Sequence, residues 1–300
     1  MKNIPIFPDF AMFGLEHKVS FETALKAFQP RISEYTFSEI FAWRGTRGTM
    51  ISAINGNIIL KFHKENDVFL SEPIGNTRIP ESIKQALEWM KNNNVNATVF
   101  GATPEIIETF GEKKEWFNIE DDRADYDYVY EAKELAELAG RKYDGKRNHL
   151  KQFNKNYAYE FVDMNEQNVA ECIKFQDKWC FLKPCEEGTL LHEENLAVME
   201  MLTNFGKLSA IGGVLKIDGQ VEGFTIAGEL NSNTVVVYVE KANHDFKGIY
   251  QALNNLFVKK SLIKYTYINR EQDVGDEGLR KAKLSYRPVF LVEKKLIRLK

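Results

Sequence analysis

The sequence has few cysteines and no long apolar run. Its 300 residues include only Cys172, Cys180 and Cys185, which is too few for a disulfide framework, and an odd number cannot all pair within the chain. Separate buried thiols in a reducing cytoplasm are the expectation. A zinc site with His192 is disfavoured, because the paired C-x2-C spacing is missing. The role of the three thiols stays open.

Features of a membrane or secreted protein are also missing. No apolar run approaches the roughly 18 residues of a membrane span. The first residues, MKNIPIFPDFAMFG, carry two prolines, an acid and a single lysine, unlike a signal peptide. We therefore expect a protein of the cytoplasm without a membrane-spanning segment.

Neither sign of charge dominates. The chain has 40 Lys and Arg against 43 Asp and Glu, a net charge of −3. This balance argues against a general nucleic-acid coat protein but leaves room for a local basic site. Hydrophobic residues make up 44% and charged residues 28%, as in ordinary globular proteins, and 300 residues predict two domains.

The order of predicted elements repeats along the chain. In each half, two helices precede strands joined by a strong hairpin dipeptide, Asn55-Gly56 in the first and Asp218-Gly219 in the second. A further strand and a helix follow, and those helices share Ile, Gln, Ala and Leu beginning at Ile83 and at Ile249. An internal duplication is predicted, with the two turns and the two helices equivalent.

The boundary between the halves shows as a change of charge. Residues 120–137 hold eight acids and two bases, whereas residues 141–155 hold six Lys or Arg and one Asp, with Gly140 between them. The predicted domains are therefore residues 1–140 and 141–300, each an α/β unit. The last strand, predicted over residues 289–299, is assigned to the second.

The stretch 265–288 combines a strand, an acidic turn and a cationic helix. The helix is predicted to bury Leu279, Ala282 and Tyr286 on one face and to stop at Pro288. Its neighbouring face would carry the cations Arg280, Lys283 and Arg287 as donor or phosphate contacts. A solvated surface is the alternative.

Candidate acids and bases lie close to this helix. Glu271 and Asp273 follow the strand, at the kind of strand end where sites of α/β proteins gather. Each is a candidate base or ammonium binder. His244, beside Asp245 at another strand end, is a further candidate.

The segment 142–155 is basic and contains aromatic residues. Lys146 and Arg147 are its candidate phosphate contacts, and Phe153 within it and Tyr157 just after it are able to stack on bases. This combination suits the acceptor end of a tRNA. The alternative is an interdomain helix that buries Phe153 and leaves its lysines in water.

Two segments carry a family resemblance. LAGRKY at 138–143 with KRNH at 146–149, and QDVGDEGLRKAKLSYRP at 272–288, resemble the C-terminal domain of bacterial phosphatidylglycerol lysyltransferases. The resemblance covers nearly the whole chain. It implies two tandem GNAT-like acyltransferase domains, as in the Fem aminoacyltransferases, with the donor between the splayed middle strands of a sheet.

The loop at 245–250, DFKGIY, departs from GNAT domains that use acetyl-CoA. Of their glycine-rich loop only Gly248 is present, Tyr250 takes the place of a small residue, and Lys247 is left as a phosphate contact. Binding of acetyl-CoA is therefore disfavoured.

The predicted function is transfer of an aminoacyl group from aminoacyl-tRNA to an amine or hydroxyl acceptor, either a small molecule or a lipid head group. No cofactor or metal is expected. An acyl-CoA-dependent N-acetyltransferase and a non-catalytic RNA- or metabolite-binding protein are the alternatives. The group transferred, the acceptor and the oligomeric state stay open.

Overall fold

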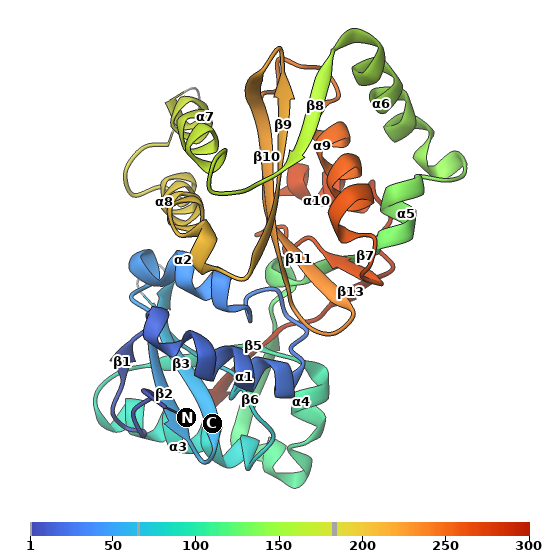
Figure 1. Ribbon diagram of the computed structural model, residues 1–300. Helices are drawn as coiled ribbons and strands as arrows, with labels where there is room; N and C mark the ends of the chain where they lie inside the picture. The colour runs from blue at the N-terminus through green and yellow to red at the C-terminus, as the bar shows by residue number, and fades with distance from the viewer. Residues whose placement is uncertain (1, 65–66, 182–184) are drawn as a thin grey trace. The chain divides into compact units, whose positions relative to one another are not determined.

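The computed structural model describes residues 2–64, 67–181 and 185–300, and the chain divides into two compact units. The first comprises residues 1–127, 272–275 and 291–300, and the second comprises residues 128–271 and 276–290. Each unit is built on one seven-stranded sheet with helices against its faces (Figure 1). The predicted α/β class is confirmed.

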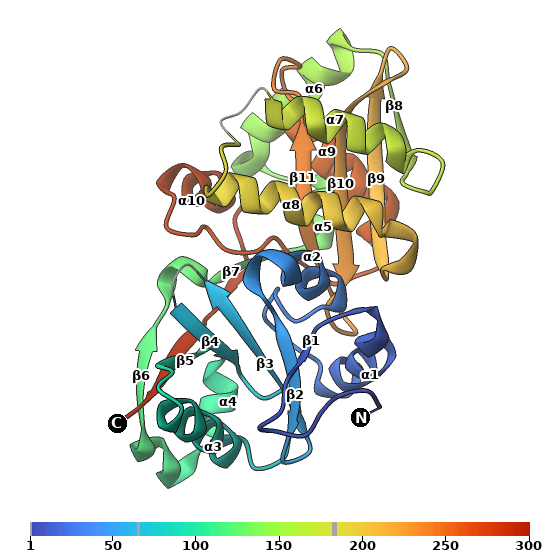
Figure 2. The same ribbon diagram turned by 90° about the vertical axis from the view of Figure 1, so that its left-hand side faces the viewer.

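The first sheet has the spatial order β1 (Ala11–Met12), β2 (Met50–Ile54), β3 (Asn57–Lys64), β4 (Asp67–Ser71), β5 (Ala97–Ala102), β14 (Lys295–Leu299) and β6 (Phe117–Asp121). β4 and β5 run parallel. α1 (Lys18–Phe28) packs on α2 (Phe37–Arg47), which lies on β3, and α3 (Ile79–Asn92) lies on β5 and β14 (Figure 2). α4 (Pro104–Glu108) follows β5.

The second sheet has the order β13 (Phe290–Val292), β7 (Asp127–Glu131), β12 (Tyr267–Asn269), β11 (Thr234–Ala242), β10 (Gln220–Glu229), β9 (Ala210–Ile217) and β8 (Tyr159–Asp163). α7 (Val169–Phe181) and α8 (Leu190–Thr203) cover one face, and α9 (Ile249–Phe257) covers the other, together with α5 (Ala132–Glu137) and α6 (Asp144–Asn156) (Figures 1 and 2). α10 (Glu277–Leu284) follows β12.

The two predicted hairpin turns occupy equivalent places in their sheets. Asn55 and Gly56 have φ of 50° and 84°, and Asp218 and Gly219 have φ of 51° and 79°, as a two-residue turn between antiparallel strands requires. Each hairpin leads to a third strand, then a crossover helix and a parallel strand. The crossover helices are α3, which contains Ile83, and α9, which begins at Ile249. The equivalent turns and helices agree with the predicted duplication.

The division of the chain differs from the expected one at residue 140. β7 belongs to the second sheet, where Tyr128, Val129 and Tyr130 are all buried. The single strand predicted over 289–299 is two strands, β13 in the second sheet and β14 in the first. Each sheet therefore receives a strand from the other half of the sequence. The change from acidic to basic residues near residue 140 indicated a boundary between two segments, but charge composition does not show which strands pair.

β14 completes the first sheet by lying between β5 and the edge strand β6. It pairs antiparallel with β5 on one side and with β6 on the other, and Ile297 is fully buried. Lys294, just before β14, is also fully buried, and its Nζ lies 2.7 Å from Glu34 Oε2 and 2.7 Å from Asp127 Oδ1. Asp127 in turn accepts hydrogen bonds from the amide and hydroxyl of Ser33, at 2.7 and 2.9 Å. Three distant segments therefore meet at one buried cation.

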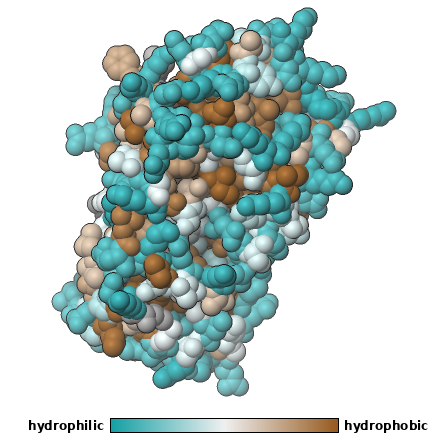
Figure 3. Space-filling model, in the orientation of Figure 1, coloured by the Kyte–Doolittle hydropathy of each residue, from teal (hydrophilic) through white to brown (hydrophobic). Residues whose placement is uncertain are grey.

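Hydrophilic residues cover most of the face seen in Figure 3, with separate hydrophobic residues between them. Among the described helices, none has both the length and the apolar composition needed to cross a bilayer.

Replacing Lys294 by Met is expected to cost about 3–5 kcal/mol of unfolding free energy near pH 7, because it leaves two buried carboxylates without their cation. Urea denaturation followed by circular dichroism measures this loss. The matched control is Lys91→Met, at an exposed position of α3, expected to stay within about 0.5 kcal/mol of the wild type. Equal stability of the two variants would contradict the structural role of Lys294.

Candidate functional site

The parallel strands of the second sheet separate after a short ladder. β11 pairs with β12 over three residue pairs, from Thr234 with Tyr267 to Val236 with Asn269. β12 ends there, whereas β11 continues to Ala242. The end of β12 and the far half of β11 therefore form a splay.

An ion pair bridges this splay. Arg270, directly after β12, bonds through its guanidinium to the carboxylate of Glu240 on β11, and both side chains are mostly buried, with 17% and 15% exposed. Asn254 of α9 donates its side-chain amide to the other Glu240 oxygen at 2.8 Å. Separating the two side chains would leave buried charges without a partner, which is unfavourable. The pair therefore holds β11 and the end of β12 at a fixed distance.

Aromatic side chains surround the guanidinium. Its carbon lies 4.9 Å from the centroid of the Tyr286 ring and 5.8 Å from that of Tyr130. Lys146 of α6 places its Nζ 3.8 Å from the centroid of the same Tyr286 ring. Tyr286 thus contacts two cations, an arrangement that the negative ring faces favour.

Lys146 is the side chain of this group that can exchange a proton near neutral pH. Partial burial, together with the positive charge of Arg270, lowers its pKa to about 8. Its ammonium form can bind an anion, and its neutral amine can accept a proton. The predicted phosphate contact Lys146 therefore lies at the splay, next to Arg270 and Tyr286.

The three cations that were predicted to share one face of α10, Arg280, Lys283 and Arg287, do not all belong to this helix. α10 ends at Leu284, before Pro288, and Arg287 follows it with φ of 57°. Lys283 donates through Nζ to the carbonyl oxygens of Arg270 and, at 3.3 Å, Glu271. It therefore holds the end of β12.

The predicted apolar face of α10 is wrong. Leu279 is 40% exposed and Ala282 is also exposed, whereas Tyr286, beyond the helix, is buried. The prediction rested only on the helical spacing of these three residues. A helix of two turns buries its apolar side chains only where neighbouring elements cover them. The phosphate-binding role of Arg280 and Arg287 stays a prediction.

The predicted acids differ in their surroundings. Asp273 is fully buried in the first unit, where it pairs with Arg123 at 3.4 Å and accepts the amide of Gly275 at 2.9 Å. It therefore holds a turn and has no exposed surface for a substrate. Glu271, at the end of β12 in the second unit, has a φ of 58° and accepts the Tyr128 amide with its backbone carbonyl.

Two further predicted residues are mainly exposed. His244 is 63% exposed and lies 3.7 Å from the Asp245 carboxylate. Lys247 is exposed and donates its backbone amide to the Tyr157 hydroxyl at 3.3 Å.

The predicted phosphate contact Arg147 instead has a local structural role. It donates to the carbonyl oxygens of Leu138 and, at 2.7 Å, of Gly140.

The loop before α9 is closely covered. Gly248 precedes the helix with φ of 89°, and a Cβ there would lie 2.7 Å from the His149 carbonyl oxygen and 3.4 Å from Phe153 Cβ, both on α6. Tyr250 in the first turn of α9 is 37% exposed. The glycine therefore serves close packing of α6 on α9.

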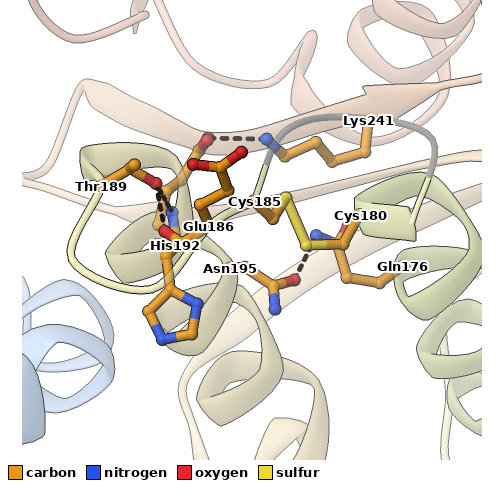
Figure 4. The surroundings of a disulfide bond; sticks show 9 residues. Gln176, Cys180, Cys185, Glu186, Thr189, His192, Asn195 and Lys241 are labelled. Atoms are coloured by element: carbon orange, nitrogen blue, oxygen red, sulfur yellow. Dashed lines mark hydrogen bonds and ion pairs between the residues drawn. A yellow bond between two sulfur atoms is a disulfide. The ribbon is translucent and has the colours of Figure 1, made fainter.

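The cysteines also differ from the expected three separate thiols. Cys180 near the end of α7 and Cys185 before α8 form a disulfide (Figure 4). The neighbouring Gln176 and Asn195 side chains are joined by a 2.8 Å hydrogen bond between α7 and α8. Cys172 is a buried thiol, and burial raises its pKa to about 12. The spacing of five residues was the available signal for the pair.

Sequence reasoning did not select Arg270 or Glu240. Arg270 directly follows β12, which is a usable signal, because strand ends in α/β sheets carry functional side chains. Glu240 lies within a strand, and its pairing depends on the register of β11 against β12. Tyr286 was assigned to an apolar face, although its ring contacts two cations.

The chain resembles known proteins over its full length. A conserved protein of unknown function from Bacteroides thetaiotaomicron VPI-5482 has a TM-score of 0.91 at 31% identity, covering 97% of this chain and 99% of that one. L-PGS from Bacillus licheniformis has a TM-score of 0.67 at 16% identity, covering 100% and 94%. FemX has a TM-score of 0.61 at 8% identity, covering 97% of each chain. The fold is that of tandem GNAT-like proteins.

Residues 25–297 match the family described as phosphatidylglycerol lysyltransferase, C-terminal. The chain belongs to this acyltransferase-like family. The uncharacterized protein MYCGA3080 of Mycoplasmoides gallisepticum (strain R(low / passage 15 / clone 2)) is 29% identical over 180 residues. That match spans 57% of this chain and 55% of the relative's length.

The lowered pKa of Lys146 can be measured directly. Reductive methylation with labelled formaldehyde, followed by NMR, should give a dimethyl-lysine signal with a titration midpoint near 8, against about 10.4 for a free lysine. Its absence from Lys146→Arg assigns it, and Lys151→Arg should leave it in place. A midpoint above 10 would contradict the desolvated environment.

Proposed function

We propose that this protein transfers an aminoacyl group from aminoacyl-tRNA to an amine or hydroxyl acceptor at the splay of the second sheet. The observation that carries the proposal is Lys146 beside Tyr286 and the Arg270–Glu240 pair. The splay is where a GNAT-like unit is expected to receive its donor. Membership of an acyltransferase-like family supports the reaction class.

The proposed reaction is one displacement at the donor ester. The acceptor nitrogen or oxygen forms a bond to the ester carbonyl carbon, and the neutral amine of Lys146 takes the proton that the acceptor loses. The tetrahedral intermediate then releases the ribose oxygen of the tRNA, which recovers a proton from Lys146. The fixed positive charge of Arg270 favours the negative carbonyl oxygen that develops in between.

Several contacts hold this arrangement in place. Tyr130 donates its hydroxyl to the Lys283 carbonyl oxygen at 2.8 Å, and the Tyr143 hydroxyl lies 2.9 Å from the Tyr286 carbonyl oxygen. Lys283 in turn binds the carbonyl oxygen of Arg270. These contacts restrict the positions of Arg270 and Tyr286, so little reorganisation is needed on substrate binding.

The proposed activity is tested with tRNA charged with labelled amino acids, supplied with phosphatidylglycerol vesicles or with ethanolamine as acceptor. We expect a labelled aminoacyl product, and we expect Lys146→Met to lower kcat by about 10²-fold, the usual contribution of a proton acceptor. The control, Lys151→Met, changes an exposed lysine of the same helix and should leave kcat unchanged. Full activity of Lys146→Met would contradict the role of Lys146 as proton acceptor. The absence of product with every charged tRNA would contradict aminoacyl-tRNA as the donor.

Acetyl-CoA is expected to bind weakly or not at all. The packing of α6 against Gly248 and the side chain of Tyr250 leave little room for the backbone to approach a pyrophosphate. Calorimetry should show no saturable heat with acetyl-CoA up to millimolar concentration. Tight stoichiometric binding would instead favour an acyl-CoA-dependent transferase.

A further inference from the structure

The first unit contains a pocket that the proposed reaction does not use. It lies against α2 and is also lined from β3, β4 and β5, with an empty volume of about 440 Å³, part of it open to solvent. Aromatic rings form much of its lining, contributed by Tyr35, Trp43, Phe62 and Phe100. All of these residues belong to the first unit.

Two carboxylates line the same pocket, and only one has its counter-ion in contact. Glu34 bonds to the buried Lys294 through both oxygens, at 2.7 and 2.8 Å. Glu39 is 8% exposed and, within the described residues, has no cation within ion-pair distance. Burial raises the pKa of Glu39 to about 7, although Arg47 and Trp43 act to lower it. Its charge is therefore incompletely compensated.

The local fold explains why Glu39 stays there. Thr36 caps α2, and its hydroxyl accepts the backbone amide of Glu39 at 3.2 Å, which places Glu39 in the first turn of the helix. An acid in this turn is favoured by the helix dipole. That benefit is small, typically below about 1 kcal/mol, compared with the cost of burying a carboxylate that has no cation in contact. Helix capping alone therefore does not account for Glu39.

The charges around the pocket are mainly negative. Glu34 and Glu39 line it, and the buried Glu72 and Asp127 lie next to this group. Against these four acids stand Lys294, which is bound to Glu34 and Asp127, and Arg47, whose guanidinium lies 4.3 Å from the Trp43 ring. A cationic ligand would reduce this imbalance, whereas an anionic ligand would increase it.

We propose that this pocket binds an organic ammonium ion, a small amine with an apolar stem. The ammonium group would pair with the Glu39 carboxylate and contact the Trp43 ring, and its stem would lie against Phe62 and Phe100. Carboxylates and aromatic faces together are the groups that recognise organic cations. The pocket is a binding site within the first unit, and the proposal does not depend on the reaction proposed for the second.

Butylammonium and its uncharged counterpart 1-butanol are suitable probes, because they differ mainly in charge. Ligand-observed NMR with the full chain should show saturable binding of butylammonium and at least tenfold weaker binding of 1-butanol. Glu39→Gln should weaken butylammonium binding at least tenfold. Glu112→Gln, at an exposed position of the same unit, is the matched control and should bind as the wild type does.

A second variant keeps the test decisive. Glu39→Gln should fold, because it replaces a poorly compensated buried charge with a neutral amide, and its melting temperature at pH 8 should be at least that of the wild type. If it does not fold, Trp43→Leu tests the aromatic contact and should weaken butylammonium binding by a similar factor. Equal binding of butylammonium and 1-butanol, unchanged binding by both variants, or preferential binding of pentanoate at Arg47 would overturn the proposal.

Discussion

The ion group of Lys294 with Glu34 and Asp127 determines how the first unit is assembled. A fully buried ammonium is tolerated only when carboxylates compensate it, and these carboxylates come from the segment before α2 and from the start of β7. Lys294 lies immediately before β14 in the chain, so the ion group sets where this strand enters the sheet between β5 and β6. Within β14, Ile297 then packs in the apolar core of the first unit and adds to the stability that the ion group provides.

Much of the fold was predictable from local patterns. The Asn55-Gly56 and Asp218-Gly219 turns have the positive φ values that their residue types favour, and the strands that they join lie where alternation and turn chemistry placed them. The exchange of strands was not predictable in this way. β7 and β14 look like ordinary β segments. β7 pairs with β12 and β14 pairs with β5, and in both cases the partner lies more than a hundred residues away in the sequence.

The candidate site was predictable in its neighbourhood but not in its members. The stretch after β12 and the basic helix α6 both contribute, through Arg270, Tyr286 and Lys146. The roles of individual side chains depended on tertiary partners instead. Lys283 binds backbone carbonyl groups and Asp273 is buried beside Arg123, because the chain after β12 turns tightly. No residue pattern distinguishes such lysines and aspartates from those that meet a substrate.

The position of β14 between β5 and β6 also has a consequence for biosynthesis. Domains generally begin to fold as their residues leave the ribosome, with the N-terminal one first. Here β5 and β6 of the first unit lack the strand that joins them until residues 295–299 have emerged. The N-terminal unit is therefore translated first but closes last, and its open strand edges must be kept from pairing with other nascent chains in the meantime.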